Sequence, residues 1–539
     1  MPSWLRDAVF YEIYPQSFKD TNGDGIGDIN GITESLDYIK ELGCNALWIN
    51  PCFDSPFRDA GYDVRDYEKV APRYGTNDDL VNLFNKAHEM GVRVLIDLVP
   101  GHTSEEHEWF KKSKSAEKTD YDDRYIWTTS WFEGADGFKY ISGESDRDGC
   151  YVINFFKSQP ALNYGFGKIT SHWQKTANDP ESLRTRDAMK NVMRFWLDKG
   201  CDGFRVDMAD SLVKNDDEEK SFTQSIWRDV REMLDRDYPE AAMVSEWGNA
   251  RLSINAGFHM DFTLNDNETG YSHLLRDYIN HGDYVATAVT QGIGAVLKTD
   301  KTIIRKNSNG NMMDFLTDYE KRLADVYGRG YVSLITGNHD TPRINAMLSD
   351  RERKLAFAFI LTLPGVPFIY YGDEIGMKYR FLPSKEGGYT RTGSRTPMQW
   401  NSGKNLGFSE SDPSMLYLPV EEEQDAPTVE SQKADKNSLF NTVKNILKVR
   451  HSRTDLQADG SFEVLKAEEG KPYIVFRRDN MIIGMNPSGE ELNGNIMAED
   501  IDGQTAKDPL GLKAIYTIGE ASYENGSLIL GPQSFVILG

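Results

Sequence analysis

Residues 200–212 read GCDGFRVDMADSL. Within this stretch, an apolar, strand-like run carries two charged side chains on alternate residues. Arg205 and Asp207 lie two residues apart, so in a strand they point to the same face. Burying an unpaired charge is costly, so a core strand holds such a pair only for a reason. The segment predicts a buried strand whose end reaches a site of chemistry.

Short apolar runs of this kind alternate along the chain with amphipathic stretches. The strand-like runs are residues 8–15, 45–51, 92–100, 202–209, 241–247, 257–264, 331–340 and 365–375. Helix-like segments between them include residues 32–43, 77–91, 186–200 and 353–365. This alternation predicts an α/β fold, and eight units match a (β/α)8 TIM barrel. A doubly wound open sheet competes with the barrel, but no G-x-G-x-x-G motif follows the first run.

Two regions depart from the alternating pattern. Residues 103–185 are aromatic, polar and charged, and they are too many for a βα loop, so they predict an inserted subdomain beside the barrel mouth. After residue 456, alternating and apolar runs between Gly, Asn and Pro turns predict a C-terminal β-sandwich. The expected domains are residues 1–102 and 186–455 (barrel), 103–185 (insertion) and 456–539 (sandwich).

Composition narrows the classes of partner. The chain has 539 residues and a net charge of −23, which disfavours nucleic acid and anionic membranes but leaves neutral ligands open. Its four cysteines show no C-x-x-C spacing, so zinc and a disulfide scaffold are not expected. The first residues lack a signal-peptide pattern, and no run of about 18 apolar residues occurs. We expect a soluble, cytoplasmic protein that is a monomer or a weak oligomer.

Charged residues recur where the strand-like runs end. Asp97 and His102 follow the third run, Arg205 and Asp207 the fourth, Glu246 the fifth, and His339 with Asp340 the seventh. In a barrel these ends meet at the rim where active sites lie. Each one alone is more simply explained as a structural ion pair, but their repetition on neighbouring strands favours catalysis.

Three carboxylates on separate strands suit glycoside hydrolysis. Retaining enzymes use one carboxylate as nucleophile and another as acid/base, about 5 Å apart. Arg205 is placed to lower the pKa of Asp207 and keep it ionised, and Glu246 beside Trp247 has a setting that could hold a proton.

Four segments carry a family resemblance: DLVPGHTS, GFRVDMAD, VSEWGNA and GNHDTPR resemble, in order, the four signature regions of glycoside hydrolase family 13, the α-amylase family. FYEIYPQSFKDTNGDGIGD, RTPMQW and GPQSFVIL are similar to its oligosaccharide-active branch. The resemblance implies Asp207 as nucleophile, Glu246 as general acid/base and Asp340 as the third carboxylate, which holds the sugar hydroxyls. It also implies that Arg205, His102 and His339 orient the nucleophile and bind the sugar in subsite −1.

The segment DAGYDVRDY (59–67) is similar to the α-glucosidase branch of that family. The match implies that Tyr62 stacks under the −1 sugar and that Asp59 binds its outer hydroxyls. Arg391, four residues before Arg395 of RTPMQW, matches the arginine that pairs with this aspartate. Such a pair would close the pocket and restrict cleavage to the non-reducing end. The alternative is that Asp59 belongs to a solvated loop.

The segment DTNGDGIGD places oxygen-bearing side chains at alternating positions, as in the first half of an EF-hand loop. Gly31 stands at position twelve instead of Glu and the preceding segment is strand-like, so an EF-hand is not expected. The resemblance implies a structural Ca²⁺ (or Mg²⁺) in this loop; the alternative is a solvated acidic turn. The implied ligands are Asp20, Asn22, Asp24, Asp28 and the carbonyl of Ile26.

Three positions depart from the family pattern. Gly101 replaces the asparagine that ligates calcium in many amylases, so a second calcium site is not expected. Ala161 replaces the aspartate of the fifth region, and Met208 after the nucleophile leaves the linkage preference open.

Together these features predict a retaining α-glucoside hydrolase that acts on short α-glucans (malto-oligosaccharides) and releases glucose from the non-reducing end. A transglycosylase, a sugar isomerase or a sucrose-cleaving enzyme of the same family is the alternative. A catalytically dead transporter subunit would have a transmembrane helix and lack the carboxylates, and a non-catalytic starch-binding module is the remaining class.

Overall fold

The computed structural model contains a closed barrel that confirms the predicted TIM fold. It describes residues 1–263, 270–276, 301–346, 348–386, 391–495, 511–524 and 526–539. Within them, eight parallel strands close in the order β1-β12-β11-β10-β9-β8-β5-β2. All eight predicted runs contain a barrel strand; residue 264 of the run 257–264 lies outside the described residues. The strands are β1 (Phe10–Ile13), β2 (Ala46–Ile49), β5 (Arg93–Leu98), β8 (Gly203–Val206), β9 (Ala242–Ser245), β10 (Met260–Phe262), β11 (Tyr331–Ile335) and β12 (Val366–Tyr370).

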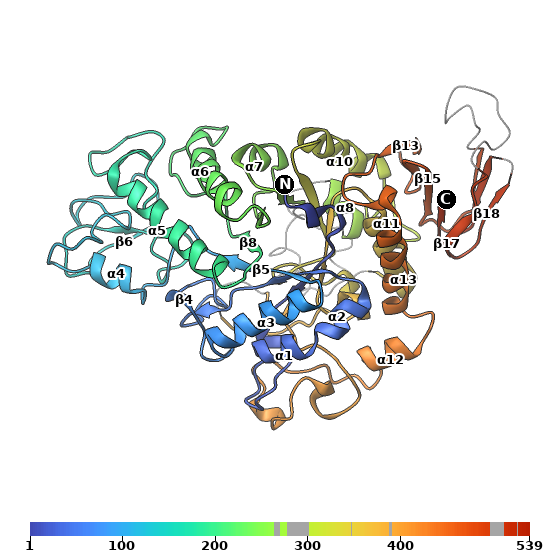
Figure 1. Ribbon diagram of the computed structural model, residues 1–539, viewed down its shortest axis with the longest axis horizontal. Helices are drawn as coiled ribbons and strands as arrows, with labels where there is room; N and C mark the ends of the chain where they lie inside the picture. Colours follow the sequence, from blue (N-terminus) through green and yellow to red (C-terminus); the bar gives the residue numbers. More distant parts are fainter. Residues whose placement is uncertain (264–269, 277–300, 347, 387–390, 496–510, 525) are drawn as a thin grey trace.

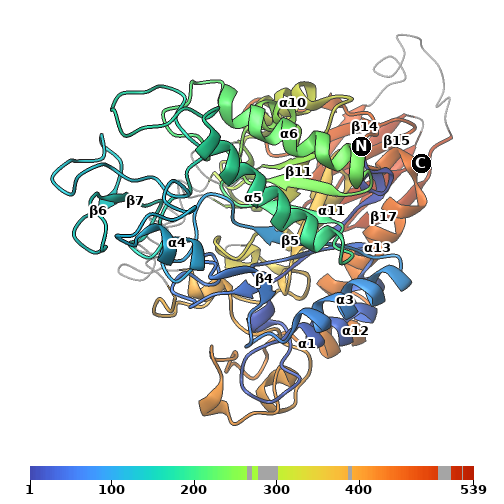
Figure 2. The same cartoon turned by 60° about the vertical axis from the view of Figure 1, so that its left-hand side comes forward.

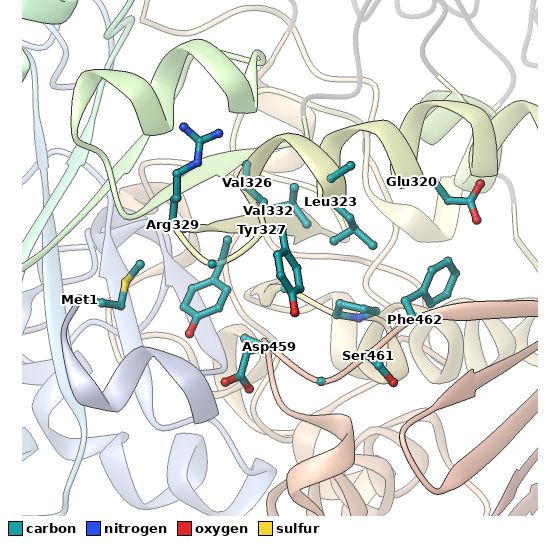
Figure 3. A pocket seen from close by; sticks show the side chains of 18 residues that line it. Met1, Glu320, Leu323, Val326, Tyr327, Arg329, Val332, Asp459, Ser461 and Phe462 are labelled. Atoms are coloured by element: carbon teal, nitrogen blue, oxygen red, sulfur yellow. The ribbon is translucent and has the colours of Figure 1, made fainter.

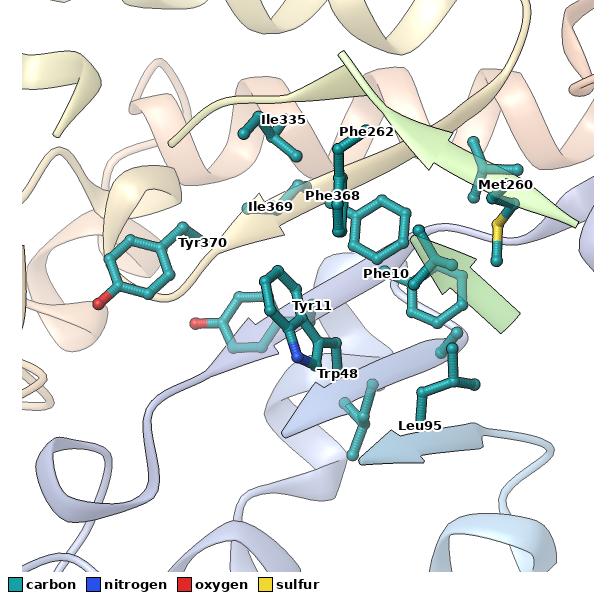
Figure 4. Close-up of a cluster of buried hydrophobic side chains, with 14 of the residues drawn as sticks. Phe10, Tyr11, Trp48, Leu95, Met260, Phe262, Ile335, Phe368, Ile369 and Tyr370 are labelled. Carbon is teal, nitrogen blue, oxygen red and sulfur yellow. The ribbon is translucent and has the colours of Figure 1, made fainter. Parts of the chain in front are cut away.

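Aromatic side chains fill the barrel interior. The rings of Phe10 and Phe368 stack with their centroids 4.3 Å apart, and Phe262 lies 4.9 Å from Phe368 and 5.3 Å from Trp48 (Figure 4). These residues come from four different strands, so the interior is a packed core and not a pore.

Helices surround the barrel (Figure 1). The predicted segment 77–91 forms α3, which begins in a capping box between Thr76 and Asp79, and 353–365 overlaps α11. The predicted helix 32–43 is split in two at Ser35, whose hydroxyl donates to the carbonyl of Gly31. The predicted helix 186–200 begins earlier, at Pro180, because proline suits the first helical turn. The helices are α1 (Ile29–Glu34), α2 (Leu36–Leu42), α3 (Asn77–Glu89), α5 (Pro180–Leu197), α6 (Ser221–Asp237), α7 (Ala250–Ala256), α8 (Gly270–Leu275), α10 (Met312–Val326), α11 (Asp350–Thr362), α12 (Val429–Ala434) and α13 (Leu439–Ser452).

The segment between β5 and α5 lies at one side of the barrel (Figures 1 and 2). It holds α4 (Glu108–Ser113) and the short pair β6 (Tyr140–Ile141) and β7 (Tyr151–Val152), as the insertion predicts. A β-bridge joins His102 to Ala161, so this segment returns to the end of β5. A second small hairpin, β3 (Phe53–Asp54) and β4 (Asp66–Val70), follows β2. The exact domain boundaries stay predictions.

Two antiparallel sheets follow α13 and lie at the opposite side of the barrel from the inserted segment (Figure 1). One has the strand order β13-β14-β15-β20-β17 and the other β16-β19-β18, with an apolar cluster that draws residues from both. Their bounds are β13 (Glu463–Lys466), β14 (Ile474–Arg478), β15 (Met481–Asn486), β16 (Leu492–Asn495), β17 (Ala514–Ile518), β18 (Ala521–Glu524), β19 (Ser527–Leu530) and β20 (Ser534–Leu538).

Two buried arginines, one on α13 and one in the five-stranded sheet, bind the end of α11 and the turn that follows it. Arg450 of α13 donates to the carbonyls of Leu361 and Gly365, both at 2.8 Å. Arg478 of β14 donates to the carbonyls of Thr362 and of Ser461, the latter at 2.7 Å. Burial lowers the pKa of Arg450 to about 9 and that of Arg478 to about 10.

Candidate active site

Arg205 forms the centre of a cluster of carboxylates at the barrel mouth. Its Nη1 donates to Asp97 Oδ1 at 2.9 Å and to Asp207 Oδ1 at 3.1 Å, and its Nη2 lies 2.7 Å from Glu246 Oε2. The three acids come from the ends of the neighbouring strands β5, β8 and β9, so the barrel geometry brings them together. The guanidinium also lies 5.0 Å from the ring of Trp48, below it in the barrel. The two charges that looked misplaced in residues 200–212 are therefore paired.

The protonation of Asp207 differs from the sequence-based expectation. Burial, and then the charge of Glu246, raise the pKa of Asp207 well above its usual range, although Arg205 lowers it. The expectation that Arg205 holds down the pKa of Asp207 is therefore wrong, because burial and the charge of Glu246 outweigh Arg205, which two other carboxylates share. Burial likewise raises the pKa of Asp97 to about 6.

Met208 links the two carboxylates through its backbone. Its amide N–H donates to Glu246 Oε2 at 3.2 Å, and its φ of 43° lies in the left-handed region. Few non-glycine residues adopt this conformation, so the turn after Asp207 is strained.

Asp340 lies on the loop after β11, and a third of its side chain is exposed. Its Oδ1 accepts from Arg391 Nη1 at 3.0 Å and from Arg395 Nη2 at 2.6 Å. Burial raises its pKa, but the charges of Arg391, His339 and Arg395 outweigh burial and hold it well below the usual range. Asp340 is therefore an anion at every working pH.

Asp59 is paired and buried, which excludes the solvated-loop alternative. It is 6% exposed, its Oδ1 lies 2.5 Å from Arg391 Nη2, and its Oδ2 accepts from Gln159 Nε2 at 2.8 Å. Arg391 thus bridges Asp59 and Asp340, which belong to loops far apart in the sequence.

Tyr62 and His339 stack in the floor of the site. Their ring centroids lie 5.3 Å apart, and the Tyr62 hydroxyl lies 2.6 Å from His339 Nε2 and 3.1 Å from Asp97 Oδ2. Behind them, the fully buried Glu12 lies 3.0 Å from His339 Nδ1. Sequence reasoning missed Glu12 because it lies 327 residues from His339 and within an apolar strand.

His102 lies between the loop that carries Tyr62 and the inserted segment. Its Nε2 is 3.0 Å from the carbonyl of Tyr62, and its Nδ1 is 3.2 Å from Asn154 Nδ2. Burial lowers the pKa of His102 to about 4, so the imidazole is neutral. Neither Asn154 nor Gln159 was assigned a role from the sequence; the QPALN match was the available signal for Gln159.

The predicted metal loop is held by its own hydrogen bonds. The backbone amides of Asn22, Asp24 and Ile26 each donate to the side chain two residues earlier, at 2.8–3.1 Å. The accepting side chains are those of Asp20, Asn22 and Asp24, so the same contact repeats at every second residue. Asp28 caps α1 by accepting from Gly31. All side-chain donors are oxygens, which suits Ca²⁺ or Mg²⁺. However, no group of three or more His, Cys, Asp or Glu side chains among the described residues, which include this whole loop, is placed to hold a metal ion.

A cavity of about 750 Å³ lies at the other end of the barrel, beside the starts of β11 and β12 (Figure 3). Tyr327, Tyr331 and Phe462 line it together with Asp459, and none of the candidate site residues does. All four cysteines are free and buried. The described residues contain no helix long and apolar enough to cross a membrane.

Known relatives share this architecture over most of their length. Trehalose synthase/amylase of Mycolicibacterium smegmatis is 34% identical, with 86% of this chain and 78% of the relative covered. Oligo-1,6-glucosidase of Heyndrickxia coagulans is 31% identical, with 89% and 90% covered. Among solved structures, isomaltulose synthase from Erwinia rhapontici NX5 is similar at a TM-score of 0.75 and 26% identity, covering 100% of this chain and 99% of that one.

A family model described as the catalytic domain of alpha amylase matches residues 12–459. These residues include all the rim carboxylates and every barrel strand, apart from the first residues of β1. The chain therefore belongs to the α-amylase family, glycoside hydrolase family 13, and is an α-glucoside-active enzyme of that family.

Proposed function

We propose that the protein is a retaining α-glucoside hydrolase that removes glucose from the non-reducing end of short malto-oligosaccharides. The observation that carries the proposal is the Asp59–Arg391–Asp340 bridge, with ion-pair distances of 2.5 and 3.0 Å. In the proposal, this charged bridge closes the end of the site, so that it accepts a terminal sugar and blocks a chain that would continue past it.

In the proposed mechanism, Asp207 in its ionised form attacks the anomeric carbon and forms a glycosyl ester. Glu246 donates a proton to the glycosidic oxygen, which leaves with the remaining chain. Glu246 then takes a proton from water, whose oxygen attacks the anomeric carbon and releases glucose and free Asp207.

The other polar groups bind and orient the sugar. Asp340 is permanently ionised and is suited to accept hydrogen bonds from two sugar hydroxyls. Tyr62 offers a ring face under the sugar, and Asp59 offers a carboxylate to its outer hydroxyls. Asp97 accepts from Arg205, Trp48 and Tyr62, so it fixes the groups that touch the substrate.

Transfer to a sugar acceptor is the second candidate. Relatives include a trehalose synthase/amylase and an isomaltulose synthase, and a variant of the latter was crystallised with its natural substrate sucrose. The same glycosyl ester serves both reactions, which differ in whether water or a sugar hydroxyl attacks it. The retained carboxylates argue against a catalytically dead transporter subunit or a binding module.

Two maltoheptaosides test the proposal, one unmodified and one with the 4- and 6-hydroxyls of its non-reducing glucose blocked. We expect kcat/KM to be at least about 100-fold lower for the blocked chain, because the added group meets the Asp59–Arg391 pair. In Asp59→Ala, which removes one partner of the Asp59–Arg391 pair, the kcat/KM values of the two substrates should differ less. Equal cleavage of both by the unaltered enzyme would rule out attack from the non-reducing end.

Maltotriose products separate hydrolysis from transfer. An excess of free glucose and maltose supports the hydrolase, whereas transfer products in excess over glucose would move the assignment to the second candidate.

We also propose that the loop from Asp20 to Asp28 binds a structural Ca²⁺ (or Mg²⁺), supported by its oxygen donors at alternating positions. Chelation with EDTA should then lower Tm by a few degrees and added Ca²⁺ should restore it, since a ligand that binds only the folded state stabilises it. The Tm of Asp24→Asn should respond less to both. A Tm that is insensitive to EDTA and Ca²⁺ would identify the loop as a solvated acidic turn.

A further inference from the structure

Lys214 lies where the barrel meets the inserted segment, seven residues after Asp207 and outside the proposed catalytic set. Its backbone pairs with that segment: its N–H donates to the carbonyl of Gly165 at 3.0 Å, and its carbonyl accepts from Gly167 at 2.9 Å. Its partly buried ammonium donates to Asn154 Oδ1 at 3.1 Å and to the carbonyl of Ser211 at 3.0 Å. Both ends of the residue are therefore fixed.

The contacts from Lys214 through Asn154 favour one tautomer of His102, the same one that the carbonyl of Tyr62 requires. An ammonium can only donate, so the oxygen of the Asn154 amide faces Lys214. The Asn154 nitrogen then faces the carbonyl of Gly101 at 3.0 Å and His102 Nδ1 at 3.2 Å. Because that nitrogen can only donate, Nδ1 must be the unprotonated acceptor. The proton is on Nε2, which donates to the carbonyl of Tyr62 at 3.0 Å.

From this arrangement we infer that Lys214 is a positioning residue of the active site. Acting through Asn154, it holds His102 with its proton on Nε2, and His102 in turn holds the backbone of Tyr62. The effect on turnover rests on the proposed function, in which Tyr62 and His102 contact the −1 sugar.

The surrounding charges favour the same state. Burial lowers the pKa of Lys214 to about 8, while Asp210 raises it and Lys220 lowers it. Burial lowers the pKa of His102 to about 4; the charge of Asp59 raises it and that of Lys214 lowers it further. Between about pH 4 and 8 the chain therefore consists of a charged lysine and a neutral histidine. A neutral donor in place of Lys214 could orient Asn154, but it would carry no charge to lower the pKa of His102.

Two variants test the chain at different links. Lys214→Met keeps the length of the side chain but removes its donors, so Asn154 Oδ1 loses its partner and only the carbonyl of Gly101 still orients the amide. We expect kcat/KM on maltose to fall about tenfold, while Tm changes by no more than about 2 °C. In Asn154→Asp the carboxylate cannot donate to Nδ1, while the carbonyl of Tyr62 still accepts from Nε2, so His102 should carry a proton on both nitrogens although the contact with Lys214 persists. Lys168→Met, which replaces an exposed lysine whose amide donates to Asn215, is the matched control.

The readouts are steady-state kinetics and ¹⁵N spectra of protein labelled in histidine, with the His102 signal assigned by its absence in His102→Gln. The unaltered protein should show an unprotonated Nδ1, Lys214→Met a shifted Nδ1 signal from the loosened hydrogen bond to Asn154, Asn154→Asp a protonated Nδ1, and Lys168→Met no change. An unchanged His102 signal in both test variants would overturn the inference. A protein that hydrolyses no α-glucoside would instead refute the proposed function, and the ¹⁵N spectra would still decide the role of Lys214.

Discussion

Replacing Asp207 with asparagine should lower kcat on α-glucosides by about 10⁴-fold or more, because the amide cannot form the glycosyl ester. The change should also leave Tm equal or raise it. Burial and Glu246 raise the pKa of Asp207, which means that the folded protein disfavours its charge, and the amide carries none. A loss of activity with a gain in stability distinguishes a reacting group from a structural one.

The control for this variant is Asp187→Asn on α5, whose side chain is 61% exposed and which should behave as the unaltered enzyme. Azide added to Asp207→Ala offers a positive test, since a small anion in the space left by the carboxylate can attack the anomeric carbon and yield the β-glucosyl azide. Turnover in Asp207→Asn within tenfold of the unaltered enzyme would exclude it as the nucleophile.

Arg205→Met should abolish turnover and destabilise the protein by about 3–5 kcal/mol at pH 8, because three carboxylates lose their shared counter-charge. Without Arg205, the pKa values of Asp97 and Asp207 rise above values that burial already elevates. An acid whose pKa is higher in the folded than in the unfolded state costs stability as pH rises through that interval. The deficit relative to the unaltered protein should therefore be largest at pH 8 and smaller at pH 5.

Denaturant unfolding at the two pH values measures this difference. Arg205→Lys keeps the charge but lacks the planar fork that reaches three acids, so it should regain much of the stability and little of the turnover. A deficit in Arg205→Met that is the same at both pH values would contradict the shared counter-charge.

The barrel could be predicted from the sequence because each strand is a local pattern. The run around Phe204 and Val206 shows its apolar character within a few residues, and the rim position of Asp207 follows from where that run ends. The break between α1 and α2 could not be predicted, since Ser35 is an ordinary residue for a helix surface and only its bond to Gly31 marks the break.

The sequence predicts which charged residues meet at the barrel mouth, but not how their charges are paired. Sequence proximity suggested that Arg205 serves Asp207, whereas the structure shows that Asp97 and Glu246 compete for it. Glu12 and Asn154 could not be found because their importance arises from contacts with His339 and His102 across long stretches of chain. Family motifs name the groups that touch substrate more readily than the groups that hold those in place.

The two arginines that bind the end of α11 have a consequence for folding. Arg450 and Arg478 both donate to carbonyls within residues 361–365, the last residues of α11 and the turn to β12, and β12 closes the barrel against β1. If the sheets were removed, the carbonyl of Thr362 would lose a charged donor at the point where the barrel closes. Arg478 therefore couples the five-stranded C-terminal sheet to the closure of the barrel, and we expect the loss of this sheet to lower the stability of the ring that the first strand begins.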